Sequence, residues 1–240
     1  MSAASEPAAG DDPLDDPLDD PLQPARYERR SHGLEFDRVA FFSDAVFAIA
    51  MTLLVVGIGI PHVRDVKLEH ALGDKSAEIF SFFLSFVVIG FYWLAHHRFF
   101  ATLGRIDRRF MELNLLFLAT IAFMPFPTAL VGVYGSRPTA VVLYASTLAT
   151  ASLLSALMIW RAQAVGLLRR KMSTAVFRWT VVASLATVVV FLVSIPIAYL
   201  VSPSAALYSW LLIFLAEMLI DRFLKPDDAD QHLHPRRRRS

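Results

Sequence analysis

The sequence contains no cysteine among its 240 residues. This absence excludes disulfide bonds, cysteine nucleophiles and metal sites built from thiolate ligands. Charged residues are also scarce, at 19% of the chain, whereas apolar residues make up 55%, a balance that is unusual for a soluble domain. The formal net charge of +1 lacks the basic bias that is typical of nucleic-acid-binding proteins. The composition therefore favours a membrane protein with no nucleic-acid partner.

Motifs of the common enzyme classes are absent as well. The sequence has no Gly-x-Ser-x-Gly, no His-Glu-x-x-His and no glycine-rich phosphate-binding loop. His96 and His97 are adjacent, so their side chains diverge by about 100° on a helix and are poorly placed to share a metal ion. We expect no catalytic residues, no metal site and no cofactor, and we exclude a nucleotide-driven pump within this chain.

Apolar residues are gathered into windows of about 20 residues, the length that crosses a hydrocarbon core of about 30 Å. We predict an all-α integral membrane protein with six transmembrane helices, at residues 39–60, 78–100, 111–133, 138–160, 176–201 and 204–224. Pro125 and Pro127 each remove a backbone donor from the third span. A kink or break of that helix is the expected result.

The basic residues are distributed unevenly about these spans. Nineteen Lys and Arg residues lie on the side of the two termini, and four lie on the opposite side. Because cytoplasmic segments carry the excess of Lys and Arg, this asymmetry predicts that both termini are cytoplasmic. The N-terminal segment lacks the basic stretch and apolar core of a signal peptide, so we expect the first span to remain in the mature protein.

Three regions are expected along the chain. Residues 1–35 contain Asp-Asp-Pro-Leu three times between Asp11 and Leu22, and this acidic, Pro-rich composition predicts a disordered cytoplasmic tail. The tail is either a solvated segment or a tethered partner-binding peptide. Residues 36–225 form the predicted six-helix transmembrane domain, and residues 226–240 form a charged cytoplasmic C-terminal tail.

The first span opens on an unusual polar motif, Arg38-x-x-x-Phe42-Ser43-Asp44, which leads directly into Ala-Ile-x-x-Thr-Leu-Leu. Ionisable groups at the head of a membrane span are costly and are normally retained for function or for an internal polar network. This gapless pattern resembles the signature of the transmembrane protein 175 family, which comprises potassium-permeable channels of endolysosomes and bacterial membranes. Trp93-x-x-His96-His97 resembles the second helix of the same family. The resemblance covers residues 36–225 and is strongest in the first three spans.

The resemblance implies a homotetramer in which span one of each subunit lines a central pore. It assigns Ile49, Leu53 and Val56 to an aliphatic constriction and Thr52 to ion preference. On an α-helix the three aliphatic residues share one face, while Asp44 lies about 140° from Ile49. From helical spacing alone, ordinary core or lipid-facing residues are the preferred explanation of the stripe, because aliphatic residues recur at this spacing in every span.

The polar half of the motif needs partners, because charges buried without them are strongly destabilising. Trp93, His96, His97 and Asn114 lie at matching depth in spans two and three. We predict a structural polar network that holds span one against these spans, made of Arg38, Phe42, Ser43, Asp44, Trp93, His96, His97 and Asn114. A proton relay through the Asp and His side chains is the alternative.

The resemblance thus implies a potassium-permeable, leak-type cation channel of the cell membrane, surrounded by lipid, with a hydrophobic constriction in helix one. Two alternatives remain open. A proton-conducting or proton-coupled transporter would use Asp44 and the His pair as titrating groups. A non-conducting membrane scaffold would bury the span-one stripe against a neighbouring protein.

Overall fold

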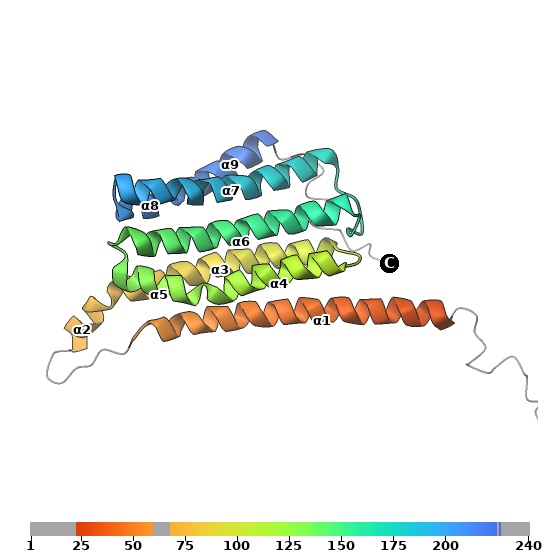
Figure 1. Cartoon of the computed structure of the whole chain (residues 1–240), viewed down its shortest axis with the longest axis horizontal. Helices are drawn as coiled ribbons and strands as arrows, with labels where there is room; N and C mark the ends of the chain where they lie inside the picture. Colours follow the sequence, from red (N-terminus) through yellow and green to blue (C-terminus); the bar gives the residue numbers. More distant parts are fainter. Residues whose placement is uncertain (1–22, 60–67, 225, 227–240) are drawn as a thin grey trace, which may run out of the picture. The chain divides into compact units, whose positions relative to one another are not determined.

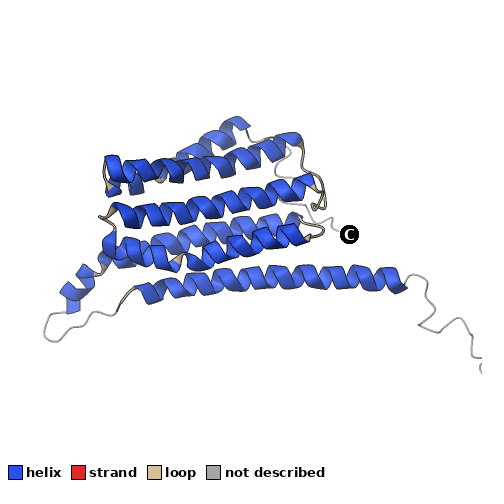
Figure 2. Cartoon of the chain, viewed as in Figure 1, coloured by secondary structure: helices blue, strands red, loops and turns tan. Residues whose placement is uncertain are grey.

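The computed structural model describes residues 23–59, 68–224 and 226. The chain divides into two units, Met1–Arg38 and Val39–Ser240. Within the described residues the secondary structure is helical, as Figure 2 shows, apart from one isolated bridge between Leu103 and Leu168. The all-α prediction is therefore confirmed.

Nine α-helices and one 3₁₀-helix make up the described part of the chain (Figure 1). In chain order they are α1 (Gln23–Leu53), η1 (Leu54–Gly57), α2 (Leu68–Asp74), α3 (Ser76–Thr102), α4 (Arg108–Phe123), α5 (Pro125–Tyr134), α6 (Pro138–Ala164), α7 (Thr174–Leu200), α8 (Pro203–Ser209) and α9 (Leu211–Leu224).

Five segments of the described part are long and apolar enough to cross a membrane. They are Phe36–Gly57, Ser76–Thr102, Arg108–Tyr134, Pro138–Ala164 and Thr174–Leu200. They correspond in order to the first five predicted spans, so the chain is a multi-pass membrane protein.

The third span breaks where its two prolines predict. Helix α4 ends at Phe123 and α5 begins at Pro125, with Met124 between them. The Met124 N–H donates to the carbonyl of Ile121 at 3.1 Å, which tightens the last turn of α4. The Thr128 hydroxyl then donates to the Met124 carbonyl at 2.8 Å. The same carbonyl also accepts the Thr128 N–H at 3.1 Å, so the backbone acceptor at the break is fully hydrogen-bonded.

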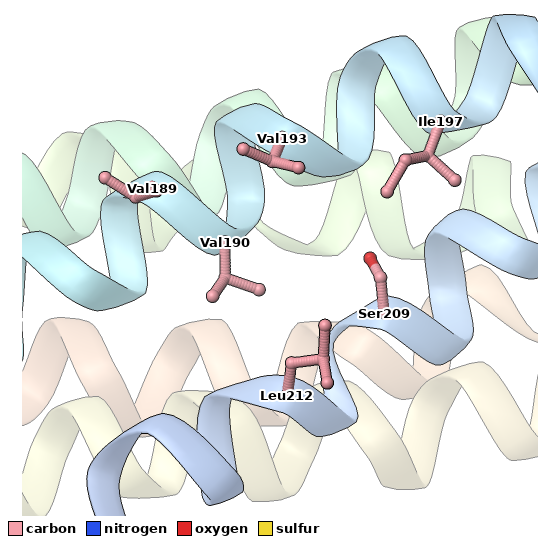
Figure 3. A pocket seen from close by; sticks show the side chains of 6 residues that line it. All are labelled: Val189, Val190, Val193, Ile197, Ser209 and Leu212. Carbon is pink, nitrogen blue, oxygen red and sulfur yellow. The ribbon is translucent and has the colours of Figure 1, made fainter. Parts of the chain in front are cut away.

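The sixth span differs from the single helix that the sequence predicts over 204–224. It is divided into α8 and α9, which meet at Trp210. The Trp210 indole stacks on Tyr144 with ring centroids 5.2 Å apart and meets Phe191 edge-on at 5.8 Å. A small cavity of about 210 Å³ lies between α7 and the α8–α9 pair (Figure 3), lined by Val189, Val190, Val193, Ile197, Ser209 and Leu212. Its lining is hydrocarbon apart from Ser209, whose hydroxyl donates to the Ala206 carbonyl at 2.7 Å.

Two further boundaries differ from the predictions. Helix α1 begins at Gln23, inside the tail predicted over 1–35, so the disordered segment predicted there is wrong from Gln23 onward. Only residues 11–22 of that tail carry the Asp-Pro repeats that oppose a helix, and residues 1–22 lie outside the described residues. The predicted C-terminal tail lies outside them too, except for Pro226.

Helix α6 is the centre of the helical packing in the second unit. It packs against α4, α5 and α7, and α7 in turn packs against α9. At one end of this arrangement, the segments that follow α3 and α6 are joined by backbone hydrogen bonds. The Gly104 N–H donates to the Leu167 carbonyl at 2.8 Å, and the Arg169 N–H donates to the Thr102 carbonyl at 2.9 Å. These bonds fix the ends of α3 and α6 to each other.

Candidate functional site in span one

One face of span one is buried against α3 and α4. Ser43, Phe47, Ala50 and Leu54 recur at i, i+4, i+7 and i+11, and all four are buried. The Phe47 ring lies 5.5 Å from the His96 ring of α3 and 5.9 Å from the Phe117 ring of α4, between ring centroids. This face anchors the span within its own subunit.

The opposite face carries the predicted constriction residues, and it is exposed. The side chains of Ile49, Leu53 and Val56 are 58%, 44% and 73% exposed. Helix α1 ends at Leu53, however, and Val56 lies in the 3₁₀-helix that follows. The prediction that one α-helix carries all three residues is therefore wrong for Val56. A 3₁₀-helix turns about 120° per residue, so Val56 lies nearly in line with Leu53, about 60° from the place that a continued α-helix would give it, and it stays on the exposed stripe.

Thr52 is exposed, and its hydroxyl donates a hydrogen bond within its own helix. Its Oγ1 donates to the Ile49 carbonyl at 2.8 Å. A hydroxyl that donates within the helix keeps acceptor lone pairs for another group. Thr52 can therefore present an oxygen to a cation without losing its own hydrogen bond.

Asp44 is bound by the second span. The Trp93 indole Nε1 donates to Asp44 Oδ1 at 2.9 Å. The ring of His97 packs near that indole, with centroids 5.5 Å apart. A half-buried carboxylate thus has a donor from its own subunit, and it lies off the exposed aliphatic stripe.

A second chain of hydrogen bonds joins span one to both α3 and α4. The Ser43 hydroxyl donates to the Val39 carbonyl at 2.9 Å and accepts from Asn114 Nδ2 at 3.1 Å. Asn114 Oδ1 lies 2.9 Å from Nε2 of His96. Because Ser43 has a single proton and gives it to Val39, Asn114 must turn its NH₂ group toward Ser43. Its oxygen then accepts from His96, whose Nε2 must carry the proton.

The surroundings of His96 are aromatic. Its ring stacks on Phe100 at 4.2 Å between centroids and is parallel to Phe117 within 2° at 5.5 Å. His96 and Asn114 are both buried. A ring held by a hydrogen bond at Nε2 and by aromatic neighbours on both sides is suited to holding helices together.

Five of the eight residues in the predicted network are joined by these bonds, namely Ser43, Asp44, Trp93, His96 and Asn114. The other three lie differently. Phe42 is exposed on the same side as Ile49, and the His97 side chain is exposed beside Trp93. Arg38 is exposed and belongs to the first of the two units.

A second buried cluster of hydroxyl groups was not predicted from the sequence. Thr128 Oγ1 lies 2.9 Å from Ser85 Oγ, which lies 2.9 Å from the Tyr144 hydroxyl. The three residues come from α3, α5 and α6 and are all buried. A usable signal was present, because each is a polar residue inside an otherwise apolar span. The cluster fixes α5, just after its proline break, to two neighbouring spans.

The described residues contain no group of three or more His, Cys, Asp or Glu side chains that could bind a metal ion. The site therefore consists of an exposed aliphatic and hydroxyl stripe on one face of span one and a polar network on the opposite side. On the exposed stripe, Thr52 supplies an oxygen among aliphatic side chains.

Comparison with known proteins finds similar sequences over the first part of the chain. Residues 38–125 match the family model described as endosomal/lysosomal potassium channel TMEM175. A potassium channel of Streptomyces collinus is 45% identical over 101 residues, which are 42% of this chain and 49% of that protein. The endosomal/lysosomal proton channel TMEM175 of Bos taurus is 33% identical over 114 residues, 44% of this chain and 24% of that protein. The chain thus spans about half of the bacterial relative and a quarter of the bovine one.

A solved structure extends the similarity beyond the matched sequence. The crystal structure of a lysosomal potassium-selective channel TMEM175 homolog from Chamaesiphon minutus has a TM-score of 0.67 and is 26% identical. The alignment covers 78% of this chain and 98% of that chain. The fold is that of a multi-pass membrane protein and is similar to the fold of this solved channel. The match to the TMEM175 family model covers residues 38–125, and the similarity in fold to this solved structure covers most of the chain.

Proposed function

We propose that this chain is the subunit of a homotetrameric, potassium-permeable, leak-type cation channel of the cell membrane. In this proposal residues 36–225 form the channel domain, and four copies of span one surround the pore. Potassium is the permeant ion and membrane lipid is the surrounding solvent. The names of the bacterial relatives and of the Chamaesiphon structure support potassium as the permeant ion.

The observation that carries this proposal is the division of span one into two faces. Its buried face, with Ser43 and Phe47, is fixed by α3 and α4, whereas Ile49 and Val56 are uncovered within the subunit. One copy of a helix cannot enclose a path for ions, so an oligomer is required. In a tetramer whose exposed faces of span one meet at a central axis, each aliphatic residue would be repeated four times and would form a ring around the pore.

Ile49 and Leu53 would form apolar rings that limit current by losing water readily, as hydrophobic constrictions do. Val56 would add a further ring from the 3₁₀-helix. Thr52 would supply an oxygen beside these rings. Its hydroxyl donates its proton to the Ile49 carbonyl, so the lone pairs of the oxygen can face the ion. The polar network behind the stripe would then position the pore-lining face without touching the ion.

Both termini are proposed to be cytoplasmic, on the strength of the uneven distribution of Lys and Arg. A reporter that is active only outside the cytoplasm should give signal when it is inserted within residues 62–76. It should give none when it is fused to either terminus. Signal from a C-terminal fusion would contradict the proposed orientation.

Ion flux from liposomes tests the function itself. Purified protein, reconstituted in vesicles that hold a potassium gradient, should dissipate that gradient without any proton gradient. Vesicles without protein are the control. An undiminished gradient, with protein shown to be tetrameric and folded, would contradict the channel and favour a scaffold.

A proton-conducting function is the second candidate, because the bovine relative is named a proton channel. In addition, Asp44 accepts a hydrogen bond from Trp93, whose indole packs near His97. Vesicles that hold a pH gradient and symmetrical potassium distinguish the two candidates. Rapid proton flux under these conditions would support the second candidate. The aromatic stacking around His96 favours the potassium pathway as the main one.

A further inference from the structure

Span one ends in a short turn whose side chains are divided between the core and the exposed face. Leu54 is buried, whereas Val56 is exposed. The Ile58 N–H donates to the Val55 carbonyl at 3.1 Å and closes this turn. Helix η1 packs against α3 and α5. The position of Val56 therefore depends on what fixes η1 to those two helices.

Two glycines allow α5 to approach both η1 and the start of α3. A Cβ atom on Gly57 would lie 3.0 Å from the Cβ of Ala129 in α5. A Cβ atom on Gly132 of α5 would lie 3.0 Å from the Cα of Glu78 and 3.2 Å from its Cγ. Even a methyl group would crowd these contacts, so glycine permits the close packing.

An ion pair connects the start of α3 to the same region. Lys75 Nζ donates to Glu78 Oε1 at 2.8 Å and to Oε2 at 3.0 Å. The two side chains are only 25% and 11% exposed. The same ammonium group lies 3.8 Å from the position of a Cβ on Gly59, just beyond η1. Lys75 thus reaches from α3 to the end of span one.

We infer that Lys75 and Glu78 form a clasp that fixes the Gly57 end of span one against α3 and α5 and thereby positions Val56. The contacts close a ring, since η1 lies on α5, α5 lies on Glu78, Glu78 binds Lys75, and Lys75 lies beside Gly59. Both charged residues are positioning residues, because they act on the pore only through η1. The effect on current rests on the proposed channel function, but the effect on the position of Val56 does not.

A spin label tests the clasp without any current. The sequence has no cysteine, so Val56→Cys takes a single nitroxide. In reconstituted full-length protein, Lys75→Met and Glu78→Gln should each give a sharper, more mobile spectrum. Lys75→Arg should retain the immobilised spectrum because it keeps the charge. Lys75→Met removes the cation of the ion pair and Glu78→Gln removes its anion. Either variant alone can test the clasp if the other gives no folded protein.

The matched control is Glu112→Gln, which removes another short-range ion pair. Arg108 Nε binds Glu112 Oε1 at 3.0 Å, with side chains 92% and 55% exposed. This change should leave the label immobilised. A label as immobile in both Lys75→Met and Glu78→Gln as in Glu112→Gln would overturn the clasp.

Currents from the unlabelled variants form the second measurement. Lys75→Met and Glu78→Gln should show a larger basal potassium current than the wild type, since a released η1 no longer keeps the Val56 ring narrow. Lys75→Arg and Glu112→Gln should match the wild type. A released label in protein whose wild type carries no current would support the clasp and refute the channel. A wild-type current that both disruptive variants leave unchanged would refute the control of the pore by the clasp.

Discussion

Trp93 donates a 2.9 Å hydrogen bond to the Asp44 carboxylate and so ties the head of span one to α3 of the same subunit. This bond matters because Asp44 is the acidic residue of the motif with which the span opens. A carboxylate that has a donor within its own subunit is available to support the helix and need not line a pore. The carboxylate of the motif is therefore bonded within the subunit, whereas Ile49 is exposed on another face of the same helix.

Asp44→Ala should lower the yield of folded oligomer more than it changes ion preference. The substitution removes the acceptor of the Trp93 indole, and hydrogen bonds to charged groups contribute about 1.5–3 kcal/mol. Asp44→Asn keeps an acceptor and is the control, with a smaller loss. Thermal unfolding in detergent and size-exclusion chromatography measure the effect. A fully stable Asp44→Ala oligomer with altered potassium-to-sodium preference would place the carboxylate in the pore instead.

Asn114→Ala should destabilise the protein because it leaves the buried His96 N–H without its acceptor. An unsatisfied buried donor costs about 1–3 kcal/mol. Thr150→Ala is a suitable control, since the exposed Thr150 hydroxyl bonds only within its own helix, at 2.8 Å to Ser146. Thermal unfolding should show a clear loss for Asn114→Ala alone. Equal melting temperatures for the two variants would mean that the network contributes nothing to stability.

Asp107 should make stability depend on pH in the acidic range. Partial burial would raise the pKa of its carboxyl group, but hydrogen bonds from Arg161 and from the Phe110 N–H outweigh it, so the pKa is lowered below 3.8. A lowered folded-state pKa contributes stability above the unfolded-state value, and that stability is lost as pH falls through the folded-state value.

Asp107→Asn retains a cap for α4, because asparagine accepts the Phe110 N–H as well as aspartate does. It removes the charge opposite Arg161, so melting temperature should vary less below pH 3.8 than in the wild type. Melting curves recorded from neutral to strongly acidic pH make the comparison. Identical acid profiles would show that this ion pair does not stabilise the fold.

Thr52→Val should reduce any preference for potassium over sodium while leaving the fold intact. Valine has nearly the same shape, and the hydroxyl that it lacks bonds only to the Ile49 carbonyl of the same helix. Reversal potentials under bi-ionic conditions measure the preference. Thr150→Val, with an equivalent bond elsewhere, should behave as the wild type. An unchanged reversal potential in Thr52→Val would remove Thr52 from the ion path.

The membrane spans were predictable because length and apolar composition suffice to identify them, and Pro125 and Pro127 located the break in the third. The break between α8 and α9 at Trp210 was not predictable, because no proline or glycine lies at that point of the sequence. It coincides with stacking of the indole on Tyr144 of a distant helix. Similarly, the start of α1 at Gln23 follows the last Asp-Pro repeat, but the acidic composition obscured it.

The site was predictable to a different extent. Residues in a continuous motif, such as Ser43 and Asp44, could be recognised from their spacing, and their partners from their depth in spans two and three. The contact between Ser85, Thr128 and Tyr144 depends on how three helices pack, and no spacing within one helix encodes it. The 3₁₀ turn at Val56 likewise depends on close packing at Gly57.

Comparison of serine substitutions at Ile49 and Met51 tests the central claim most directly. Ile49 is exposed, whereas Met51 is half-buried with its methyl group 4.0 Å from the position of a Cβ on Gly90 of α3. Hydroxyl groups in an apolar ring would keep it wet, so Ile49→Ser should raise the basal cation current and weaken the preference for potassium over sodium. Met51→Ser should chiefly reduce stability. Currents are to be compared in the same bilayers at matched amounts of folded protein. A larger current from Ile49→Ser alone is the predicted result, and equal currents from the two variants would mean that span one does not present Ile49 to a pore.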